Sequence, residues 1–172
     1  MSPTVRTADV RDADALAELN AVVQELHRAE RGDFFVAVEP AAAASWFRET
    51  LESGRGRAWL AEDGTRPLGF VLVLPLTRPA GLFTAADAWW ELDQIAVRPT
   101  DRRRGVARRL VETVLDAARR EGVPRVEAAT WEFNRAARET FAATGFSPRV
   151  RRWERRLAGG REDGFSGDSR GG

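Results

Sequence analysis

Hydrophobic residues recur every three or four positions in four segments of the chain, which predicts four amphipathic helices. The clearest segment ends near Arg120, where Val106, Leu110 and Val114 share one face and arginines occupy much of the opposite face. Gly122 follows directly and is typical of a helix end. The other helices are expected to begin after Asp12, near Ala41 and at Asn134.

Short runs of apolar, β-branched and aromatic residues between these helices predict the strands. Two of them flank Asp63 and Gly64, a pair of residues typical of a tight hairpin turn. The expected strands lie around Val5, on both sides of that turn, directly before Arg98, at 125–131 and at 148–157. Helices and strands in this order indicate an α/β domain with a mixed sheet.

The composition excludes several classes of protein. The chain of 172 residues contains no cysteine, which excludes disulfides, thiolate zinc sites and cysteine nucleophiles. No apolar run approaches the roughly 18 to 20 residues of a membrane span, and the N-terminal residues lack the apolar core of a signal peptide. We therefore expect a cytoplasmic domain at 1–157 without a membrane partner, followed by a disordered, glycine-rich polar tail at 158–172.

Charge is distributed unevenly along the chain, although the formal net charge is only +1. Residues 1–97 hold nine arginines and fifteen acidic residues, a balance of −6, whereas residues 98–156 hold sixteen and eight, a balance of +8. Every basic side chain is an arginine, so the abundance of arginine is weak evidence by itself. The distribution favours an anionic ligand for the second half.

That half opens with the arginine-rich stretch "RPTDRRRGVARRLVE" at residues 98–112. A strand precedes it and a helix begins within it, so backbone N–H groups and the helix dipole are directed at one spot. Gly105 and the small Ala107 leave room for a ligand close to the backbone, which favours a pyrophosphate. Binding of a nucleic-acid duplex by this helix is a weaker interpretation, because Leu110 and Val114 are expected to pack one face of the helix against the core. We therefore expect no nucleic-acid partner.

Two short motifs decide between the remaining anion-binding folds. A Walker P-loop and the three-glycine dinucleotide fingerprint are both absent from the arginine-rich stretch. What remains, Arg102-x-x-Gly105-x-Ala107, resembles the acetyl-CoA signature of the GNAT superfamily of N-acetyltransferases. The order of expected elements also agrees with that superfamily from residue 4 to about 157. A second motif is similar to the superfamily's later motif in register: Asn134-x-x-Ala137-x-x-x-Phe141-x-x-x-Gly145-Phe146.

The resemblance implies the GNAT fold, a mixed and mostly antiparallel sheet of six or seven strands, flanked by about four helices and splayed at an acetyl-CoA site. It implies that backbone amides of the turn bind the pyrophosphate of acetyl-CoA and that the preceding strand pairs with its pantetheine arm. Asn134 is expected to cap its helix, and members of the superfamily also use this residue to contact the cofactor. The residues implied in cofactor binding are Ile95, Ala96, Val97, Arg102, Arg103, Arg104, Gly105, Val106, Ala107, Arg108 and Asn134.

An acceptor amine must lose its proton before it can attack, and a carboxylate near the acceptor serves this purpose in many relatives. Glu91 and Asp93 are the candidates for this catalytic base. They lie two apart on a strand, so both side chains are expected on the face that carries Ile95 and Val97, unless a bulge resets the alternation. Relatives have the base at the position that matches either one, so both stay open. The alternative is that the carboxylates only bind a cationic substrate.

Two other residues are weighed for the same task. Glu132, at the end of a later strand, is a third candidate for the base. His27 is the only histidine, and we interpret it as a surface residue of the first helix, with a role as a base in the acceptor cleft as the alternative.

Phe141 departs from the pattern of the superfamily. Tyrosine is common at this position, where its hydroxyl can protonate the leaving thiolate, and this chain contains no tyrosine. Water, another side chain or unassisted departure of the thiolate would have to replace that step.

The resemblance implies direct transfer of an acetyl group from acetyl-CoA to a primary amine of a small molecule or a peptide, in a ternary complex and without a metal. The alternative is an acyl-CoA-binding module without efficient catalysis, which Phe141 favours and the pair Glu91 and Asp93 opposes. The expected last strand carries alternating arginines that suit either a dimer contact or a protected edge, so monomer and homodimer both stay open.

Overall fold

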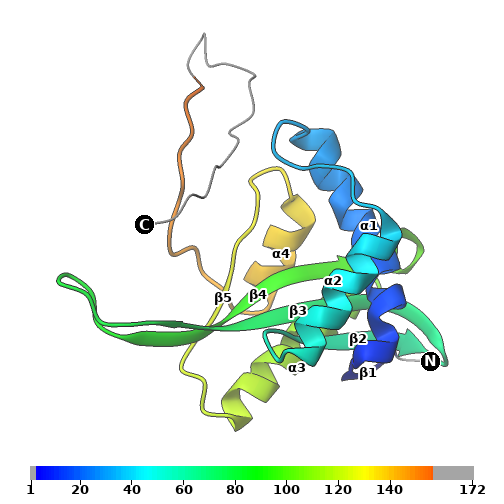
Figure 1. The fold of residues 1–172 in the computed structure, drawn as a ribbon, viewed down its shortest axis with the longest axis horizontal. Coiled ribbons are helices and arrows are strands. Elements are labelled where there is room, and N and C mark those ends of the chain that lie inside the picture. Colours follow the sequence, from blue (N-terminus) through cyan, green and yellow to red (C-terminus); the bar gives the residue numbers. More distant parts are fainter. Residues whose placement is uncertain (1–2, 157–172) are drawn as a thin grey trace, which may run out of the picture.

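One mixed sheet organises the chain, and its strands lie in sequence order, β1-β2-β3-β4-β5 (Figure 1). The computed structural model describes residues 3–156, so the tail expected at 158–172 lies outside the described residues. Strands β1 to β4 are antiparallel to their neighbours, whereas β5 is parallel to β4. In chain order the elements are β1 (Thr4–Thr7), the 3₁₀ helix η1 (Val10–Asp12), α1 (Ala13–Glu30), α2 (Pro40–Glu52), β2 (Arg57–Asp63), β3 (Arg66–Arg78), β4 (Asp87–Val97), the 3₁₀ helix η2 (Pro99–Asp101), α3 (Val106–Arg120), β5 (Val126–Ala128) and α4 (Arg135–Ala143).

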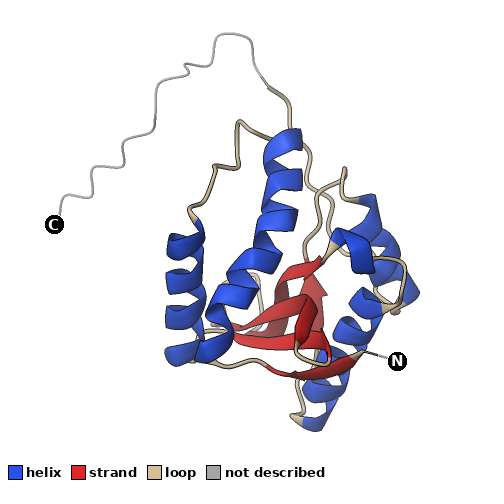
Figure 2. Ribbon diagram, turned by 90° about the vertical axis from the view of Figure 1, so that its right-hand side faces the viewer, coloured by secondary structure: helices blue, strands red, loops and turns tan. Residues whose placement is uncertain are grey.

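The helices cover both faces of this sheet (Figure 2). On one face, Leu16 of α1 and Phe47 of α2 pack in one buried cluster with Phe70 of β3. On the other face, Leu110 of α3 lies in a second cluster with residues of β2, β3 and β4, to which α4 adds Phe141. The apolar stripes read from the sequence therefore face the sheet, and the four expected helices are confirmed.

The sheet has five strands within the described residues, not the six or seven expected. The segment at 148–156, expected as the last strand, has no regular secondary structure. Arginine or glutamate interrupts both faces of its alternating pattern, so it has no continuous apolar face to pack on the sheet. Val150 and Trp153 are accordingly 84% and 83% exposed. An ion pair of 3.0 Å between Arg31 and Glu154 ties the segment to the end of α1 instead.

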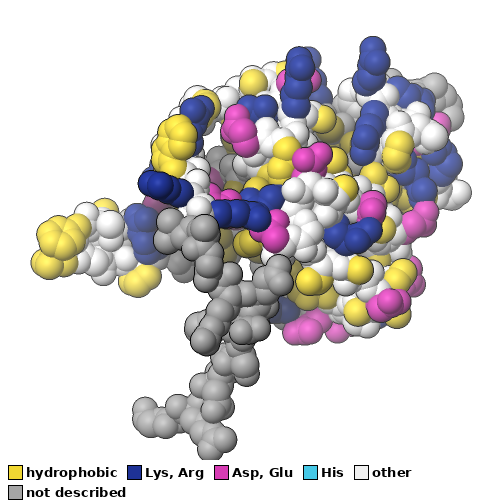
Figure 3. All heavy atoms as spheres, turned by 90° about the horizontal axis from the view of Figure 1, so that it is seen from above, with side chains coloured by type: hydrophobic (Ala, Val, Ile, Leu, Met, Phe, Trp, Pro, Cys, Tyr) yellow, Lys and Arg dark blue, Asp and Glu magenta, His cyan; other side chains and the backbone are white. Residues whose placement is uncertain are grey.

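Strands β3 and β4 continue beyond the other strands as a projecting hairpin (Figure 1). A bridge between Gly81 and Thr84 closes the turn at its end. The tip carries Leu82 and Phe83, which are 91% and 92% exposed, and Figure 3 shows hydrophobic side chains at the end of this projection. Strand β4 is therefore longer than the sequence indicates, because one end belongs to the hairpin and the other end reaches the turn before α3.

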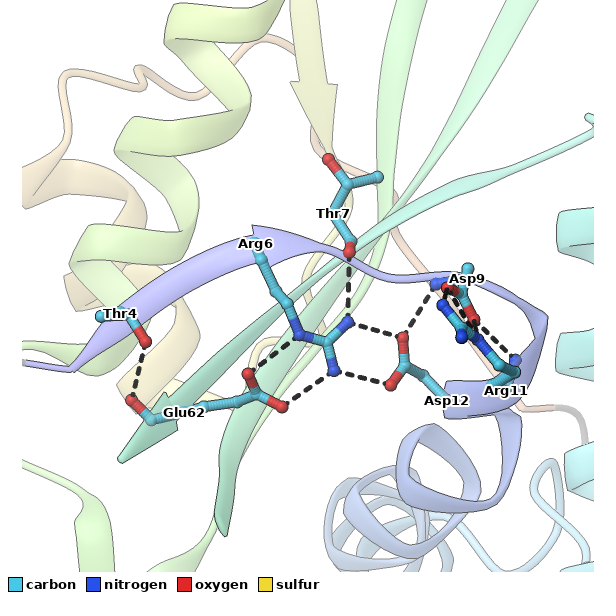
Figure 4. Close-up of polar contacts among 7 residues, drawn as sticks. All are labelled: Thr4, Arg6, Thr7, Asp9, Arg11, Asp12 and Glu62. Atoms are coloured by element: carbon cyan, nitrogen blue, oxygen red, sulfur yellow. Dashed lines mark hydrogen bonds and ion pairs between the residues drawn. The ribbon is translucent and has the colours of Figure 1, made fainter. Parts of the chain in front are cut away.

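Arg6 ties the first strand to the sheet and to the start of α1 (Figure 4). Its guanidinium donates paired hydrogen bonds to Asp12, both 2.8 Å, and to Glu62, both 2.9 Å. Asp12 occupies the N-cap position of α1, as expected, but its side chain makes no capping bond to that helix. The turn η1 precedes α1, so Asp12 instead accepts from the backbone N–H of Asp9, which in turn caps η1 through Arg11. The hydrogen bond from Arg6 lowers the pKa of Asp12.

We expect Arg6→Met to lower the free energy of unfolding by about 1–2 kcal/mol, because it leaves two largely buried carboxylates without their partner at a partly exposed site. Arg11→Met is the matched control, since the Arg11 side chain is 87% exposed and pairs with Asp9 alone among the described residues. Urea denaturation of the two variants measures both losses. Equal losses would contradict a central role for Arg6.

Candidate functional site

Strand β4 parts from β5, the last strand in the order of the sheet, partway along its length. Its pairing with β5 covers only Trp90 to Leu92, whereas its pairing with β3 continues to Val97. Beyond Leu92, one edge of β4 therefore has no neighbouring strand among residues 3–156. Backbone N–H and C=O groups along such an edge need partners, which an extended ligand can supply. The expected splay of the sheet is present.

A β-bulge lies at the point where the strands part. Leu92 is opposite Val73 and Gln94 is opposite Leu72, so Asp93 is the extra residue. Because of this residue, Leu92 and Ile95 face the same core cluster on the α3 side of the sheet. The simple alternation expected from Glu91 to Val97 does not hold, and the bulge is the reason.

Asp101 anchors the turn that connects β4 to α3. It is 2% exposed, and its carboxylate accepts hydrogen bonds from Arg66 at 2.8 and 2.9 Å and from Arg104 at 2.7 Å. The Thr100 hydroxyl donates a further bond of 3.1 Å. The hydrogen bond from Arg66 is the main cause that lowers the pKa of Asp101 below its ordinary value. An ionised carboxylate thus ties the turn to the start of β3.

The N-terminus of α3 presents backbone donors without a side-chain cap. Gly105 is the N-cap residue, with a φ of 76°, and it has no side chain to offer. A Cβ added there would meet no atom within 4 Å, so the space above the turn is open. Arg103 also has a positive φ, 62°, which is uncommon for a residue with a side chain. A turn of this kind before a helix forms a concavity for an anion, and Arg104 and Arg108 line a hollow of about 230 Å³ beside it.

Several arginines of this turn are engaged by the protein itself. Arg104 is held by Asp101, and Arg108 pairs with Glu112 at 2.7 Å. Arg102 donates to the carbonyl oxygen of Val97 at 3.4 Å. The structure therefore brings the expected cofactor-binding segments 95–97 and 102–108 together, with the backbone as their main free donor.

A cavity of about 300 Å³ lies between the parted strands. Its walls come from α1, from the loop before α2, from β4 at the bulge, from the segment after β5 and from α4. Residues that define these walls are Gln24, His27, Phe35, Asp93, Trp131 and Phe141.

The two candidate bases differ in their surroundings. Asp93 lines the cavity and is exposed to solvent. Partial desolvation of its carboxyl group by surrounding protein atoms raises its pKa, and a hydrogen bond with the Gln94 side chain opposes this shift. Glu91 is not among the residues that line this cavity, and its carboxylate accepts a hydrogen bond of 3.2 Å from the Trp89 indole. Burial also raises the pKa of Glu91. Of the two carboxylates, Asp93 alone lines the cavity.

His27 lines the cavity, so its interpretation as a surface residue is wrong. Its ring stacks on Phe35 with 4.7 Å between centroids and meets Phe133 edge-on at 5.7 Å. Burial lowers the pKa of the imidazole, which favours the neutral ring. Glu132, by contrast, has a side chain that is 82% exposed and pairs with Arg138 at 2.9 Å, outside the lining of the cavity.

Asn134 and Phe141 connect the cavity to α4. The Asn134 side chain accepts a hydrogen bond of 3.2 Å from the backbone N–H of Ala137, which confirms its expected role as a helix cap. It also lines the cavity. Phe141 is 7% exposed, packs against Phe146 and contributes an apolar ring to the cavity wall.

The aromatic walls on the side of α1 were not predicted from the sequence. Phe35 and Trp131 lie in loops that are about one hundred residues apart in the chain, with 5.4 Å between their ring centroids. The one available signal was the apolar run at 34–38, which begins with Phe34 and Phe35, in the loop after α1. A run of this kind is unusual in an exposed connection, although it does not reveal which segment it faces.

Within residues 3–156, no three His, Asp and Glu side chains are grouped in a way that could hold a metal ion. None of the helices in that part of the chain is both long and apolar enough to span a membrane.

Comparison with known proteins identifies related sequences and folds. Residues 23–146 match the model of the acetyltransferase (GNAT) family. No curated protein matches the chain.

Solved structures share the fold at low sequence identity. A tetramutant of the BH1408 protein from Bacillus halodurans is 22% identical, covers 90% of this chain and 99% of its own, and has a TM-score of 0.83. A ribosomal-protein-alanine N-acetyltransferase from Brucella melitensis biovar Abortus 2308 is 16% identical over 91% of this chain and 100% of its own, with a TM-score of 0.70. An aminoglycoside N-acetyltransferase, AAC(6')-Iy in complex with CoA, is 18% identical over 91% and 95%, with a TM-score of 0.71.

We expect Asp101→Asn to lower the thermal midpoint and to speed hydrogen exchange of the amides in the turn at 99–105, because Arg66 and Arg104 lose their common partner. Since the pKa of Asp101 is lowered in the folded state, its contribution is present above the ordinary carboxyl pKa and is lost as the pH falls. The difference from the wild type should therefore be largest near neutral pH and narrow below about pH 4.

Asp116→Asn is the control for this experiment, since Asp116 pairs on the surface of α3 with Arg119 and 60% of its side chain is exposed. It should leave both the thermal midpoint and exchange in the turn unchanged. Unchanged exchange in the Asp101 variant would show that the turn does not depend on the buried carboxylate.

Proposed function

The chain belongs to the acetyltransferase (GNAT) family, and we propose that it transfers an acetyl group from acetyl-CoA to a primary amine by direct attack in a ternary complex. The observation that carries the proposal is the convergence of an uncapped helix N-terminus, a free strand edge and the Asp93 carboxylate on one region of the fold. Two structural neighbours are named as N-acetyltransferases, one of a ribosomal-protein alanine and one of aminoglycosides, which supports an amine as the acceptor. The absence of cysteine from the chain argues against a covalent acetyl-enzyme on a thiol.

The residues present fit acetyl-CoA. A side chain at Gly105 would extend into the open space above the turn, which glycine leaves free for a ligand. Backbone amides of residues 102–108 would hold the pyrophosphate there, at the positive end of the α3 dipole. The free edge of β4 from Ile95 to Val97 would pair with the amides of the pantetheine arm. Asn134, at the start of α4, would lie beside the arm, because it lines the same cavity as Ile95.

When bound, acetyl-CoA supplies a thioester whose carbonyl carbon accepts the lone pair of the amine and whose sulfur leaves as a thiolate. Asp93 accepts the proton that the ammonium must lose before it can attack, either directly or through one water. Its raised pKa brings the carboxylate closer to the amine in basicity, which helps this proton transfer. Phe141 gives the cavity an apolar wall and has no proton to donate to the leaving group.

Phe141 also supports a second candidate function, an acyl-CoA-binding module with little or no turnover. A hydrocarbon ring in the wall of the cavity would still pack against a bound thioester while offering no acid. Saturable binding of acetyl-CoA without acetylation of any amine would favour this candidate.

We expect Gly105→Asp to weaken acetyl-CoA binding by about a hundredfold and Gly105→Asn by about tenfold, measured by calorimetric titration. Both residues tolerate a positive φ and have the same shape, so the difference between them isolates the repulsion between a carboxylate and the pyrophosphate. Gly122→Asp is the control, since Gly122 also has a positive φ, 68°, above open space but lies at the other end of α3. Equal affinities of wild type and Gly105→Asp would exclude the phosphate cradle.

We expect Asp93→Asn to lower kcat by about a hundredfold or more, because the amine loses its proton acceptor. In the wild type, kcat/KM should fall as the pH drops through the raised pKa of Asp93, since the protonated carboxyl cannot act as a base. That acidic limb should be missing from the variant. Glu91→Gln is the matched control, because Glu91 is held by Trp89 away from the cavity. A larger loss in Glu91→Gln than in Asp93→Asn would assign the base to Glu91.

A further inference from the structure

The acceptor side of the cavity is walled by aromatic rings. His27 stacks on Phe35, and Phe35 meets Trp131 edge-on with 5.4 Å between the centroids. Phe133 stands behind them, stacked on Trp131 at 5.8 Å. Such rings bind an apolar body and attract an ammonium group through their π-faces.

Charge in this cavity has one sign. Asp93 is the only acidic side chain among the residues that line it, and neither arginine nor lysine lines it. His27 is the one other titratable lining residue, and its burial keeps it neutral near neutral pH. The lining therefore favours a cationic group, whereas an anionic group would have no positively charged partner among the lining residues.

The arginine that lies over the Trp131 ring is engaged in ion pairs. Arg31 lies over the Trp131 ring, 5.0 Å from its centroid, but its guanidinium donates to Asp33 at 2.9 Å and to Glu154 at 3.0 Å. Its side chain is only 18% exposed, and it does not line the cavity. Arg156 pairs with the same two carboxylates, so two arginines and two carboxylates balance in this cluster and Arg31 is already engaged.

We infer that the acceptor is a small primary amine with an uncharged, apolar body and no carboxylate near the amino group. The inference rests on the proposed function and deepens it by naming the class of acceptor. A carboxylate beside the amine would enter a cavity whose only charge is the like charge of Asp93, and it would lose its hydration without a compensating ion pair. The cavity of about 300 Å³ lies at the small end of ligand sites and would also take part of the pantetheine arm, which favours a compact amine over an oligosaccharide.

The experiment compares 2-phenylethylamine with phenylalanine, which differs from it only by the carboxylate. Acetylation is followed by release of CoA, and binding of each amine to the CoA-loaded protein is followed by calorimetry. We expect kcat/KM for 2-phenylethylamine to exceed that for phenylalanine by about a hundredfold. The amine of phenylalanine is the less basic of the two, so it is more often deprotonated, and amine basicity therefore works against the expected order.

Variants of the cavity test the physical cause. Trp131→Leu should raise KM for 2-phenylethylamine without changing the affinity for acetyl-CoA, whereas Phe34→Leu, at a ring beside Trp131 that does not line the cavity, should change neither. Asn20→Arg adds a cation to the lining and should raise the relative kcat/KM for phenylalanine by about tenfold. Asn20→Gln, which keeps the position polar and uncharged, should not.

The outcomes separate this inference from the proposed function. Failure to bind acetyl-CoA would overturn the proposed function. Equal or better acetylation of phenylalanine would overturn the inference and leave the transferase intact, as would a preference for a peptide amide with an N-terminal alanine. Equal binding of the two amines in calorimetry, or no binding of either, would overturn the inference even if turnover were absent.

Discussion

The short pairing between β4 and β5 is the constraint on which the site depends. Three residue pairs join these strands, and the bulge at Asp93 begins where the pairing ends. A strand that packs on both faces but pairs on one side leaves backbone groups that something must satisfy. In this fold the same break also creates the cavity, because the strands diverge while α1 and α4 continue beside them. The unpaired edge of β4 and the cavity beside it are thus two consequences of one interruption in the sheet.

The arginine-rich stretch has a different task from the one its charge indicates. Arg104 is tied to Asp101 and Arg108 to Glu112, while Arg109 donates to the carbonyl oxygen of Pro3. Arg98 likewise pairs with Glu18 of α1 at 2.8 Å. Much of the positive charge therefore holds the turn and the ends of α3 in place. In the proposed function, the anion would be held by backbone N–H groups at the start of α3, which Gly105 leaves uncapped because it has no side chain.

The parts of the fold that the sequence predicts are those that depend on neighbours in the chain. Helices follow from apolar periodicity and the turn before α3 from one glycine, so both could be read directly. The cavity depends on His27, Phe35, Asp93 and Trp131, which come from four separate segments. No local pattern reports that those segments meet. The bulge is equally invisible to periodicity, since one extra residue places Ile95 on the face opposite to the one that the alternation from Glu91 predicts. The strand expected at 148–156 fails for a local reason, because both of its faces carry charge.

This division explains why the family of the chain is easier to recognise than its acceptor. A site made of backbone groups depends on few side chains. It requires a small residue where the ligand approaches the backbone and a residue that tolerates a positive φ where the chain turns. Those requirements stay at fixed spacing and survive as a motif. A cavity made of side chains can be rebuilt by changing any wall, and apart from β4 the walls here are helices and loops outside the sheet. If the proposed function holds, specificity for the amine resides in the charge of Asp93 and the shape of the aromatic walls, which are properties of the folded chain rather than of any one segment of its sequence.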